Sequence, residues 1–387
     1  MYLQEQAEKG QTRSVFIMNG AVMKVFVSNA TSFIGRNLIE NLKNIRDGKN
    51  RTRPNISISE ISDADADLAV ILPGSDVSAV ISGLGKATKL IYISGLAGSA
   101  DENIIRDFDE NAFVYRLPEI VGKWQDASDG VIASLCYAIA NDEPYTVDRP
   151  NEILDILFID DFLEEMYDAI EGKPHRCNYP MAGERSSDTT ADYDGKTRVP
   201  QENGNYCYSP KTIKATVSSI VEKLKSFNCL NYTFIIPEIP QGTLDHRLYS
   251  MYLSYLPERK MTYPLRMNID NRGIFTELIK TVNNGQVSIN IARPNNIRGQ
   301  HWHNNKWEIF IVVSGHGLIQ ERKIGTEEVY NFEVRGEEMR AVIMLPGYAH
   351  NIINLEDDKD LVTVMYSNEQ FDERYPDTYF EIVEDKF

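Results

Sequence analysis

The feature that most constrains the fold is a series of short apolar strands after residue 262. Segments such as GQVSINIARP, WEIFIVVSGHGLIQ, EVYNFEVRG and LVTVMYSNE are rich in β-branched residues, are bounded by turn signals and carry no helical stripe. Regular short strands of this kind predict an antiparallel barrel or jelly roll for the C-terminal part of the chain.

The chain before this series has a different pattern. MKVFVSNATSFIGRNLIENL (23–42) predicts a strand, a polar turn and a helix, and segments such as KLIYISG (89–95) predict buried parallel strands. Apolar stripes predict helices over 158–172, with an Asp cap, and over 209–227. We therefore expect an α/β plus all-β chain, with an N-terminal extension (1–22), a Rossmann-like doubly wound domain (23–240) containing a loop insertion (173–210), and a jelly-roll β-barrel domain (241–387). Prolines in IPEIPQGTLDHRL favour an extended connector near the boundary at 240.

Composition restricts the partners. The chain has 40 Lys plus Arg against 57 Asp plus Glu, a formal net charge of −17, so we expect no nucleic-acid partner. No run reaches the roughly 18 apolar residues of a spanning helix, and the N-terminal apolar stretch is broken, so we expect neither a signal peptide nor a membrane partner. The four cysteines show no CxxC spacing and indicate buried, reduced thiols in a cytoplasmic protein.

RGQHWHNNKWEIFIVVSG (298–315) is the strongest chemical signal. His301 and His303 are two apart, so in a strand both side chains point the same way. Glu308 follows after a turn, and His350 lies in a later strand. The patterns H-x-H-x4-E-x6-G and G-x2-H-x3-N resemble the two cupin motifs, and this resemblance implies a metal site formed by these four residues. Three imidazoles and one carboxylate suit a divalent cation, zinc first, with iron, manganese and nickel left open.

Two segments beside this motif suggest a substrate. NIDNRGIFTELIKT and GQVSINIARPNNIRGQHWH resemble segments of the nucleotide-sugar 3,5-epimerases of the deoxyrhamnose pathway, which are themselves cupins. The resemblance implies that Arg272 and Arg298 bind a diphosphate, that Gln286 binds the nucleoside or sugar, and that Glu277 lines the pocket.

The turn in 23–42 resembles the TGxxGxxG turn of extended short-chain dehydrogenases, but it keeps only the third glycine. The resemblance places the cofactor against Ser28, Asn29, Ala30, Ser32, Phe33, Ile34 and Gly35. Asn tolerates a left-handed φ, so the turn can persist, whereas a side chain at Ser32 narrows the space for a phosphate. The catalytic Tyr-x-x-x-Lys of that superfamily is missing from LAGSADENIIRDFDE. We therefore expect NADP(H) use to be impaired.

Over its whole length the chain resembles the family of the capsular polysaccharide assembling protein CapF, through segments such as LYSMYLSYLP, VYRLPEIVGKW and YPDTYF. In that family the cupin epimerises C3 of a UDP-4-keto-6-deoxy amino sugar, and the dehydrogenase domain then reduces C4 with NADPH. The resemblance implies a homodimeric, metal-dependent C3 epimerase of a UDP-sugar in capsular or surface polysaccharide biosynthesis, with an impaired reductase half. A bifunctional epimerase and reductase, or a non-catalytic sugar-binding or assembly protein, remain alternatives.

The base for such an epimerisation stays open. In the metal-free epimerases the histidine at the His301 position is the base, but an imidazole bound to a metal cannot also accept the proton. We favour His301 as a ligand. The other candidates for proton transfer are Glu277, Lys280, Tyr348 and Tyr366.

Overall fold

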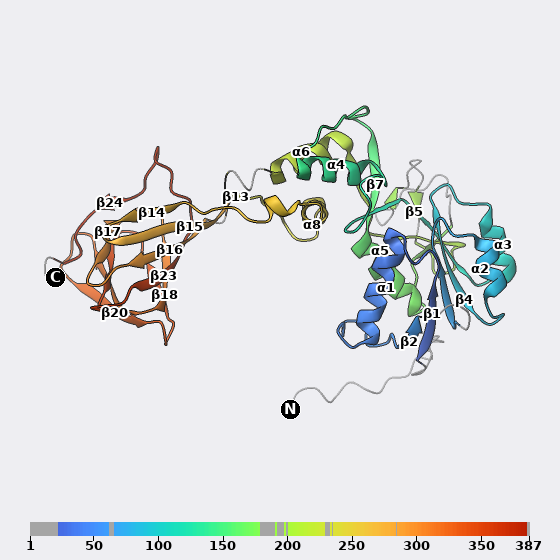
Figure 1. Ribbon diagram of the computed structural model, residues 1–387, viewed down its shortest axis with the longest axis horizontal. Coiled ribbons are helices and arrows are strands. Elements are labelled where there is room, and N and C mark those ends of the chain that lie inside the picture. Colours follow the sequence, from blue (N-terminus) through green and yellow to red (C-terminus); the bar gives the residue numbers. More distant parts are fainter. Residues whose placement is uncertain are drawn as a thin grey trace. The chain divides into compact units, whose positions relative to one another are not determined.

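The computed structural model describes residues 22–61, 66–178, 190–191, 197–198, 200–228, 233, 235–283 and 285–384. The chain divides into two compact units (Figure 1), unit 1 with Met1–Ala138 and Asp142–Val221, and unit 2 with Ile139–Asn141 and Glu222–Phe387. The predicted extension lies outside the described residues except for Val22, as does the middle of the predicted insertion. The predicted domain boundary at residue 240 stays a prediction.

The main sheet of unit 1 is parallel through its centre. Its strand order is β2-β1-β3-β4-β5-β11-β8, and only β8 at one edge pairs antiparallel with its neighbour. The strands are β1 (Met23–Val27), β2 (Ile58–Ile61), β3 (Leu68–Ile71), β4 (Lys89–Gly95), β5 (Phe113–Leu117), β8 (Arg176–Cys177) and β11 (Tyr206–Cys207). The predicted parallel strands are confirmed, and two strands form within the ends of the predicted insertion.

Helices cover both faces of this sheet (Figure 1), which explains why its strands are apolar throughout. One core joins the sheet to α1 (Phe33–Arg46) and α5 (Ile159–Ile170), and a second joins it to α2 (Val77–Gly83) and α3 (Asp101–Phe108). The predicted Asp cap of α5 is wrong, because the N-cap residue is Phe158 and the Asp side chains lie in the first turn.

Two further predictions, the helix over 209–227 and the extended connector after it, are corrected by the elements that precede the sheets of unit 2. The predicted helix over 209–227 begins as strand β12 (Ile213–Thr216), which pairs with β7 (Ile153–Phe158), and becomes helix α6 (Val217–Asn228). The predicted extended connector ends in helix α8 (Leu244–Leu253), capped by Thr243. The other elements are β6 (Glu119–Val121), α4 (Val131–Asn141), β9 (Thr190–Ala191), β10 (Thr197–Arg198), β13 (Ile235–Ile236) and η1 (Glu258–Lys260). Cys136, Cys177 and Cys207 are buried, as predicted, and no described disulfide includes them; Cys229 lies outside the described residues.

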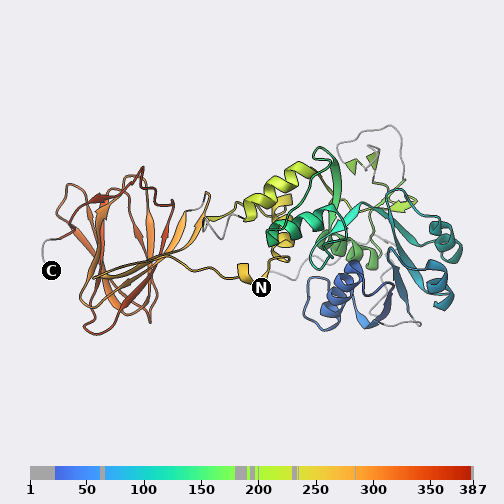
Figure 2. The same cartoon turned by 45° about the horizontal axis from the view of Figure 1, so that its top comes forward.

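Unit 2 consists mainly of strands, coloured orange to red in Figure 2. One sheet has the order β13-β15-β16-β23-β18-β21, with β14 beside β15, and the other has the order β20-β19-β22-β17-β24. The first contains β14 (Met267–Asp270), β15 (Gly273–Thr281), β16 (Gln286–Ala292), β18 (Glu308–Ser314), β21 (Ala341–Met344) and β23 (Leu361–Ser367). The second contains β17 (Ile297–Trp302), β19 (His316–Lys323), β20 (Val329–Arg335), β22 (Tyr348–Asn354) and β24 (Tyr379–Phe380).

The two sheets of unit 2 share one apolar core. Phe310, Val312 and Leu361 of the first sheet pack in one cluster with Ile319 and Ile352 of the second. Side chains that alternate with these along each strand lie on the outer faces. The predicted antiparallel pairing is confirmed for these strands, while β13 pairs parallel with β15. Among the described residues, no helix combines the length and apolarity needed to cross a membrane.

Candidate metal centre

The four residues predicted as ligands lie together in unit 2. Ligand atoms of His301, His303, Glu308 and His350 are all within 4.8 Å of one another. Glu308 Oε2 is 3.4 Å from His350 Nε2 and 3.7 Å from His303 Nε2. One carboxylate oxygen and the imidazole nitrogens therefore converge on one point.

Strand pairing explains this convergence. His301 of β17 lies directly opposite His350 of β22, after an irregularity in register between Gly299 and His301. Gly299 has φ +91°, and a Cβ there would lie 2.9 Å from the carbonyl oxygen of His350. Only glycine fits this close approach without strain. Glu308 is the first residue of β18 and lies two positions before the core residue Phe310, so its side chain has the same orientation and faces the interior.

The centre is buried and leaves polar atoms unpaired. His303, Glu308 and His350 are at most 5% exposed. Within the described part of the chain, His303 Nε2, Glu308 Oε2 and His350 Nε2 have no hydrogen-bond partner. Each unpaired buried polar atom costs about 1–3 kcal/mol, so three at one point indicate a site for a ligand that satisfies all of them.

The protonation states suit a cation. Burial, together with the neighbouring His350 and His303, lowers the pKa of His301 to about 3, so its imidazole is neutral. Burial opposes ionisation of Glu308, but contacts from His303 and His350 outweigh it and hold the pKa of this carboxyl well below its usual range. A neutral imidazole and a carboxylate are the forms that bind a metal.

Two residues that the sequence did not point to contact the ligand set. The Nδ1–H of His303 donates to the main-chain carbonyl of Asp377, which leaves the Nε2 lone pair facing the centre. Lys306 Nζ lies 3.2 Å from Glu308 Oε1, which leaves Oε2 for the centre. Neither was predicted as a site residue, because Lys306 occupies an unspecified position of the H-x-H-x4-E pattern and Asp377 lies far along the chain, in YPDTYF.

The first sheet carries further predicted residues beside the centre. Lys280, Gln286, Ser367 and Glu308 are successive cross-strand partners over β15, β16, β23 and β18, so they share the inner face. Lys280 Nζ forms an ion pair of 2.6 Å with Oε2 of Glu277, which lies opposite the buried Ser288. The structure thus brings three predicted residues to the face that bears Glu308.

The two tyrosine candidates differ in position. Tyr348 lies two residues before His350 in β22 and so has the same orientation, at the end of the strand. Tyr366 alternates with the inward Ser367, and its ring packs on Trp307 with centroids 5.5 Å apart. Tyr366 therefore lies on the outer face, away from the centre.

The predicted diphosphate arginines share one carboxylate. Asp270 Oδ2 lies 2.7 Å from Arg272 Nη2 and 3.2 Å from Arg298 Nη1. Arg298 also donates from Nε to Asn290 Oδ1 at 2.9 Å, and its buried Nη2 has no hydrogen-bond partner among the described residues. Hydrogen bonding from Arg272 lowers the pKa of Asp270. The two guanidinium groups converge on a position already held by an anionic group.

The predicted cofactor turn of unit 1 keeps its shape, but the side chain of Ser32 occupies the Gly35 amide. Asn29 has φ +48°, which confirms the predicted left-handed residue, and a Cβ at Gly35 would lie 2.4 Å from the Asn29 carbonyl oxygen. Ser32 Oγ accepts from the N–H of Gly35 at 3.1 Å and donates to the Asn29 carbonyl at 2.7 Å. A pyrophosphate binds at such a helix N-terminus through free N–H groups. The residues present therefore fit a dinucleotide poorly.

A buried ion pair lies at the carboxyl ends of β4 and β5, the end at which open parallel sheets bind their ligands. Arg116 forms two hydrogen bonds to Glu102, of 3.0 and 2.8 Å, and its guanidinium lies 4.1 Å from the ring centroid of Tyr206. This pair was not predicted from the sequence. It provides neither the tyrosine nor the lysine of the catalytic motif.

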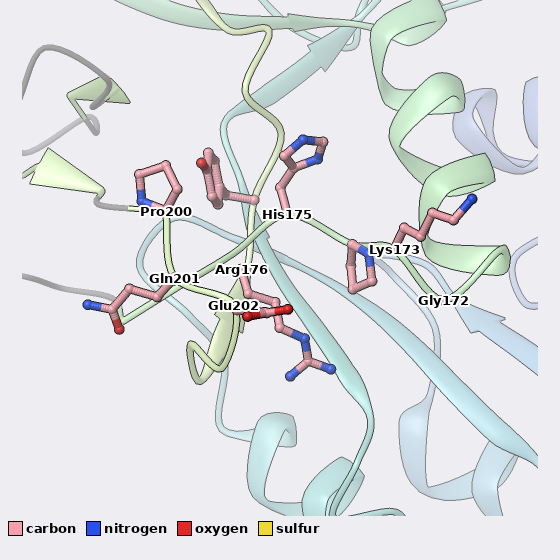
Figure 3. Close-up of a pocket in the computed structure, with 9 residues that line it drawn as sticks. Gly172, Lys173, His175, Arg176, Pro200, Gln201 and Glu202 are labelled. Carbon is pink, nitrogen blue, oxygen red and sulfur yellow. The ribbon is translucent and has the colours of Figure 1, made fainter. Parts of the chain in front are cut away.

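A separate pocket of about 500 Å³ lies in unit 1 (Figure 3), but its side chains do not converge. Its lysine, Lys173, pairs with Glu171 at 2.9 Å, and its histidine, His175, contacts Glu165 through Nδ1 at 2.7 Å. Glu165, Asp168 and His175 form a second group with metal-ligand atoms close together. Glu165 already accepts hydrogen bonds from Tyr115 and His175, so this group is a satisfied network.

Comparisons with known proteins place these observations in a family context. The model described as the polysaccharide biosynthesis C-terminal domain matches residues 268–379. The structure of the capsular polysaccharide assembling protein CapF from Staphylococcus aureus is 32% identical, with a TM-score of 0.78, and the match covers 93% of this chain and 100% of that one. CapF with the inhibitor 3-isopropenyl-tropolone is 33% identical, with a TM-score of 0.77 and the same coverage.

A reductase is similar over a shorter length. The UDP-2-acetamido-2,6-beta-L-arabino-hexul-4-ose reductase of Pseudomonas aeruginosa is 29% identical over 310 residues, which are 76% of either chain.

Proposed function

Since this chain belongs to the CapF family, we propose that it epimerises C3 of a UDP-4-keto-6-deoxy amino sugar with the help of a divalent cation. In this proposal unit 2 is a cupin and unit 1 a Rossmann-like dehydrogenase domain with little or no reductase activity. The similarity to CapF and to a UDP-sugar reductase supports a nucleotide-sugar enzyme of capsular polysaccharide biosynthesis.

The buried centre carries the proposal. Three unpaired polar atoms, on His303, Glu308 and His350, meet at one point beside the neutral imidazole of His301. Three nitrogen ligands and one oxygen ligand suit zinc, and iron, manganese and nickel are also compatible. Without a ligand, apolar side chains at these positions would be at least as stable as buried charged and polar groups, so the presence of this set supports a bound cation.

The inner face supplies the other requirements of the reaction. Epimerisation beside a ketone removes an α-proton and stabilises the enolate, and a cation held at the centre would supply Lewis-acid stabilisation of several kcal/mol. Inversion at C3 needs a base that removes the proton on one face of the sugar and an acid that delivers a proton on the other. The Lys280–Glu277 pair, on the face that bears Glu308, is one candidate for these two roles. Tyr348 is another, because it shares the orientation of His350.

The arginine pair and a buried glutamine would bind the substrate. Arg272 and Arg298 would exchange part of their contact with Asp270 for the diphosphate, because a doubly charged anion attracts both guanidinium groups more strongly. Gln286 is buried, and its Oε1 has no hydrogen-bond partner in the described residues, so it can accept from a sugar hydroxyl or amide.

Exchange of the C3 proton tests the proposal. The zinc-loaded protein, incubated with the UDP-4-keto sugar in deuterated water, is expected to incorporate deuterium at C3 in the proton NMR spectrum. His303→Asn should reduce the rate at least about 100-fold. His316→Asn should keep it, since His316 pairs with Glu333 and lies in β19 five residues before Glu321, the residue opposite His350. Equal exchange by wild type and His303→Asn would contradict the proposal.

A bifunctional epimerase and reductase is the second candidate. The similarity to a reductase and the preserved left-handed turn at Asn29 favour it. The Ser32 cap and the Arg116–Glu102 pair count against it. Oxidation of NADPH in the presence of the keto-sugar, followed at 340 nm, would support this candidate. If neither exchange nor oxidation occurs while UDP-sugar still binds, a non-catalytic binding protein is the remaining alternative.

We also propose a homodimer. The outer face of the first sheet of unit 2 carries apolar rows in register, including Ile289, Val364 and Ile311, and the neighbouring Ile343 is 53% exposed. Such a face suits burial against a second copy. Light scattering should give twice the chain mass, and Ile311→Glu should give the mass of one chain.

A further inference from the structure

We propose that Asp377 is a positioning residue for the metal centre, which holds His303 and the turn after it in ligating geometry before a cation binds. This inference rests on the proposed role of the centre. It adds to that role a residue far along the chain that touches no reacting atom.

The carboxylate of Asp377 organises the spacer between two ligands. Its Oδ1 accepts from the N–H of Asn304 at 2.8 Å, and its Oδ2 accepts from the N–H groups of Asn305 and Lys306 at 2.7 and 3.0 Å. These are three of the four residues that separate His303 from Glu308. Three successive amides directed at one carboxylate form an anion-binding turn whose shape depends on that carboxylate.

The main chain of the same residue orients the ligand itself. The Asp377 carbonyl accepts the Nδ1–H of His303, so the neutral ring presents Nε2 to the centre. The hydroxyl of Thr378 lies 3.4 Å from the same Nδ1. One residue thus sets both the tautomer of a ligand and the path of the chain to the next ligand, as outer-shell partners do in other metal sites.

The chain after Asp377 is attached to the sheet that bears the histidines. β24 lies beside β17 (Figure 1), and their pairing places Phe380 opposite His301 and Tyr379 opposite Trp302. Beyond β24, the N–H of Val383 donates to Gln300 Oε1 at 2.8 Å. Asp377 is therefore held in place by main-chain pairing and by the Gln300 contact, which use none of the ligand side chains of the centre, as a positioning residue requires.

Zinc affinity of the full-length protein tests this inference. Asp377→Asn keeps the main-chain carbonyl but lacks the second anionic oxygen, and we expect about 10-fold or greater weakening in competition with a chromophoric chelator. Asp372→Asn is the matched control, because that carboxylate lies in the same segment but pairs with the exposed Arg374, and we expect less than a 2-fold change. An unchanged affinity in a folded Asp377→Asn protein would overturn the inference.

A measurement on the metal-free protein separates this inference from the proposed function. In 15N-labelled wild type, the long-range 1H–15N spectrum should show His303 as the single Nδ1–H tautomer, and Asp377→Pro, which displaces the segment, should show a mixture of tautomers. If His303 is already mixed in wild type, or if zinc affinity falls only in proportion to the loss of folded protein, Asp377 has no positioning role. These outcomes do not depend on whether the protein is an epimerase.

Discussion

His301 of β17 and His350 of β22 lie directly opposite each other, with ring centroids 4.6 Å apart. Opposed residues of an antiparallel pair share a face, so the backbone alone holds two imidazoles together. The pairing needs no cation to form. The centre is therefore largely prepared before it binds one, and its properties can be tested on the isolated protein.

Zinc should stabilise the folded protein through this centre. A ligand that binds only the folded state adds about 2.7 kcal/mol when its free concentration is about 100-fold above Kd. We expect zinc to raise the melting temperature of wild type and EDTA to reverse the increase. His350→Asn should abolish the zinc effect. A zinc-induced shift that persists in His350→Asn would show that zinc acts elsewhere.

Gly299→Ala should disturb both stability and the centre. At φ +91° any side chain is strained by about 1–2 kcal/mol, and here the new Cβ would also meet the His350 carbonyl oxygen at 2.9 Å. Gly325→Ala isolates the first effect, because Gly325 has φ +81° and no described atom within 4 Å of its Cβ position. Urea denaturation should show the larger loss for Gly299→Ala, and only that variant should bind zinc more weakly.

Glu165 allows a test of a buried carboxyl in unit 1. Burial raises the pKa of Glu165, against hydrogen bonds from Tyr115 and His175 that lower it. A pKa raised by folding gives stability that is fully present below the unfolded value of about 4.3 and is lost as the pH rises through the folded value. Glu165→Gln removes this loss and keeps an acceptor for Tyr115, so it should be at least as stable as wild type at about pH 7.

Glu165→Ala is the contrasting variant. It leaves the buried Tyr115 hydroxyl without its acceptor, and we expect a loss of about 1–3 kcal/mol in chemical denaturation. The free energy of unfolding of Glu165→Gln relative to wild type should increase as the pH rises through the folded-state pKa of Glu165. A pH-independent difference would mean that the carboxyl titrates alike in the folded and unfolded chain.

The Arg116–Glu102 pair should behave as a structural ion pair. Arg116→Met leaves the carboxylate of Glu102, 6% exposed, without its cation and should cost about 3–5 kcal/mol. Arg116→Met combined with Glu102→Leu should lose less, because no isolated charge remains. Urea denaturation of wild type, the two single variants and the double variant completes the double-mutant cycle. If Arg116→Met folds as well as wild type, the pair has no structural role.

Several features could be predicted because they depend on local periodicity. The parallel strands around KLIYISG are apolar on both faces, and the strands of unit 2 alternate, so each pattern indicates its own burial. The left-handed conformation of Asn29 could be predicted because the turn between the first strand and helix needs a residue that tolerates a positive φ. The four residues of the centre could be proposed together because their spacing resembles the two cupin motifs, and the period of two along a strand explains the shared direction of His301 and His303.

Other features depend on contacts between segments that no local pattern connects. Asp377 reaches His303 from 74 positions along the chain, and Arg116 pairs with Glu102 because β5 and α3 meet at one end of the sheet. The sequence offers Tyr366 and Tyr348 equally as candidates, and only strand register places Tyr366 on the outer face. Helix α8, where a connector was predicted, shows that a Thr cap and helical packing outweighed the preceding prolines.

The sequence by itself determined most strand and helix types, because these follow from periods of two or 3.6, and its motif resemblances identified the cofactor turn and the metal-ligand candidates. Only the tertiary structure decided which of them meet: the register that opposes His301 to His350, the outward position of Tyr366 and the attachment of Asp377 to the centre. The reason is that register and packing are set by interactions summed over the whole unit, which no single segment contains.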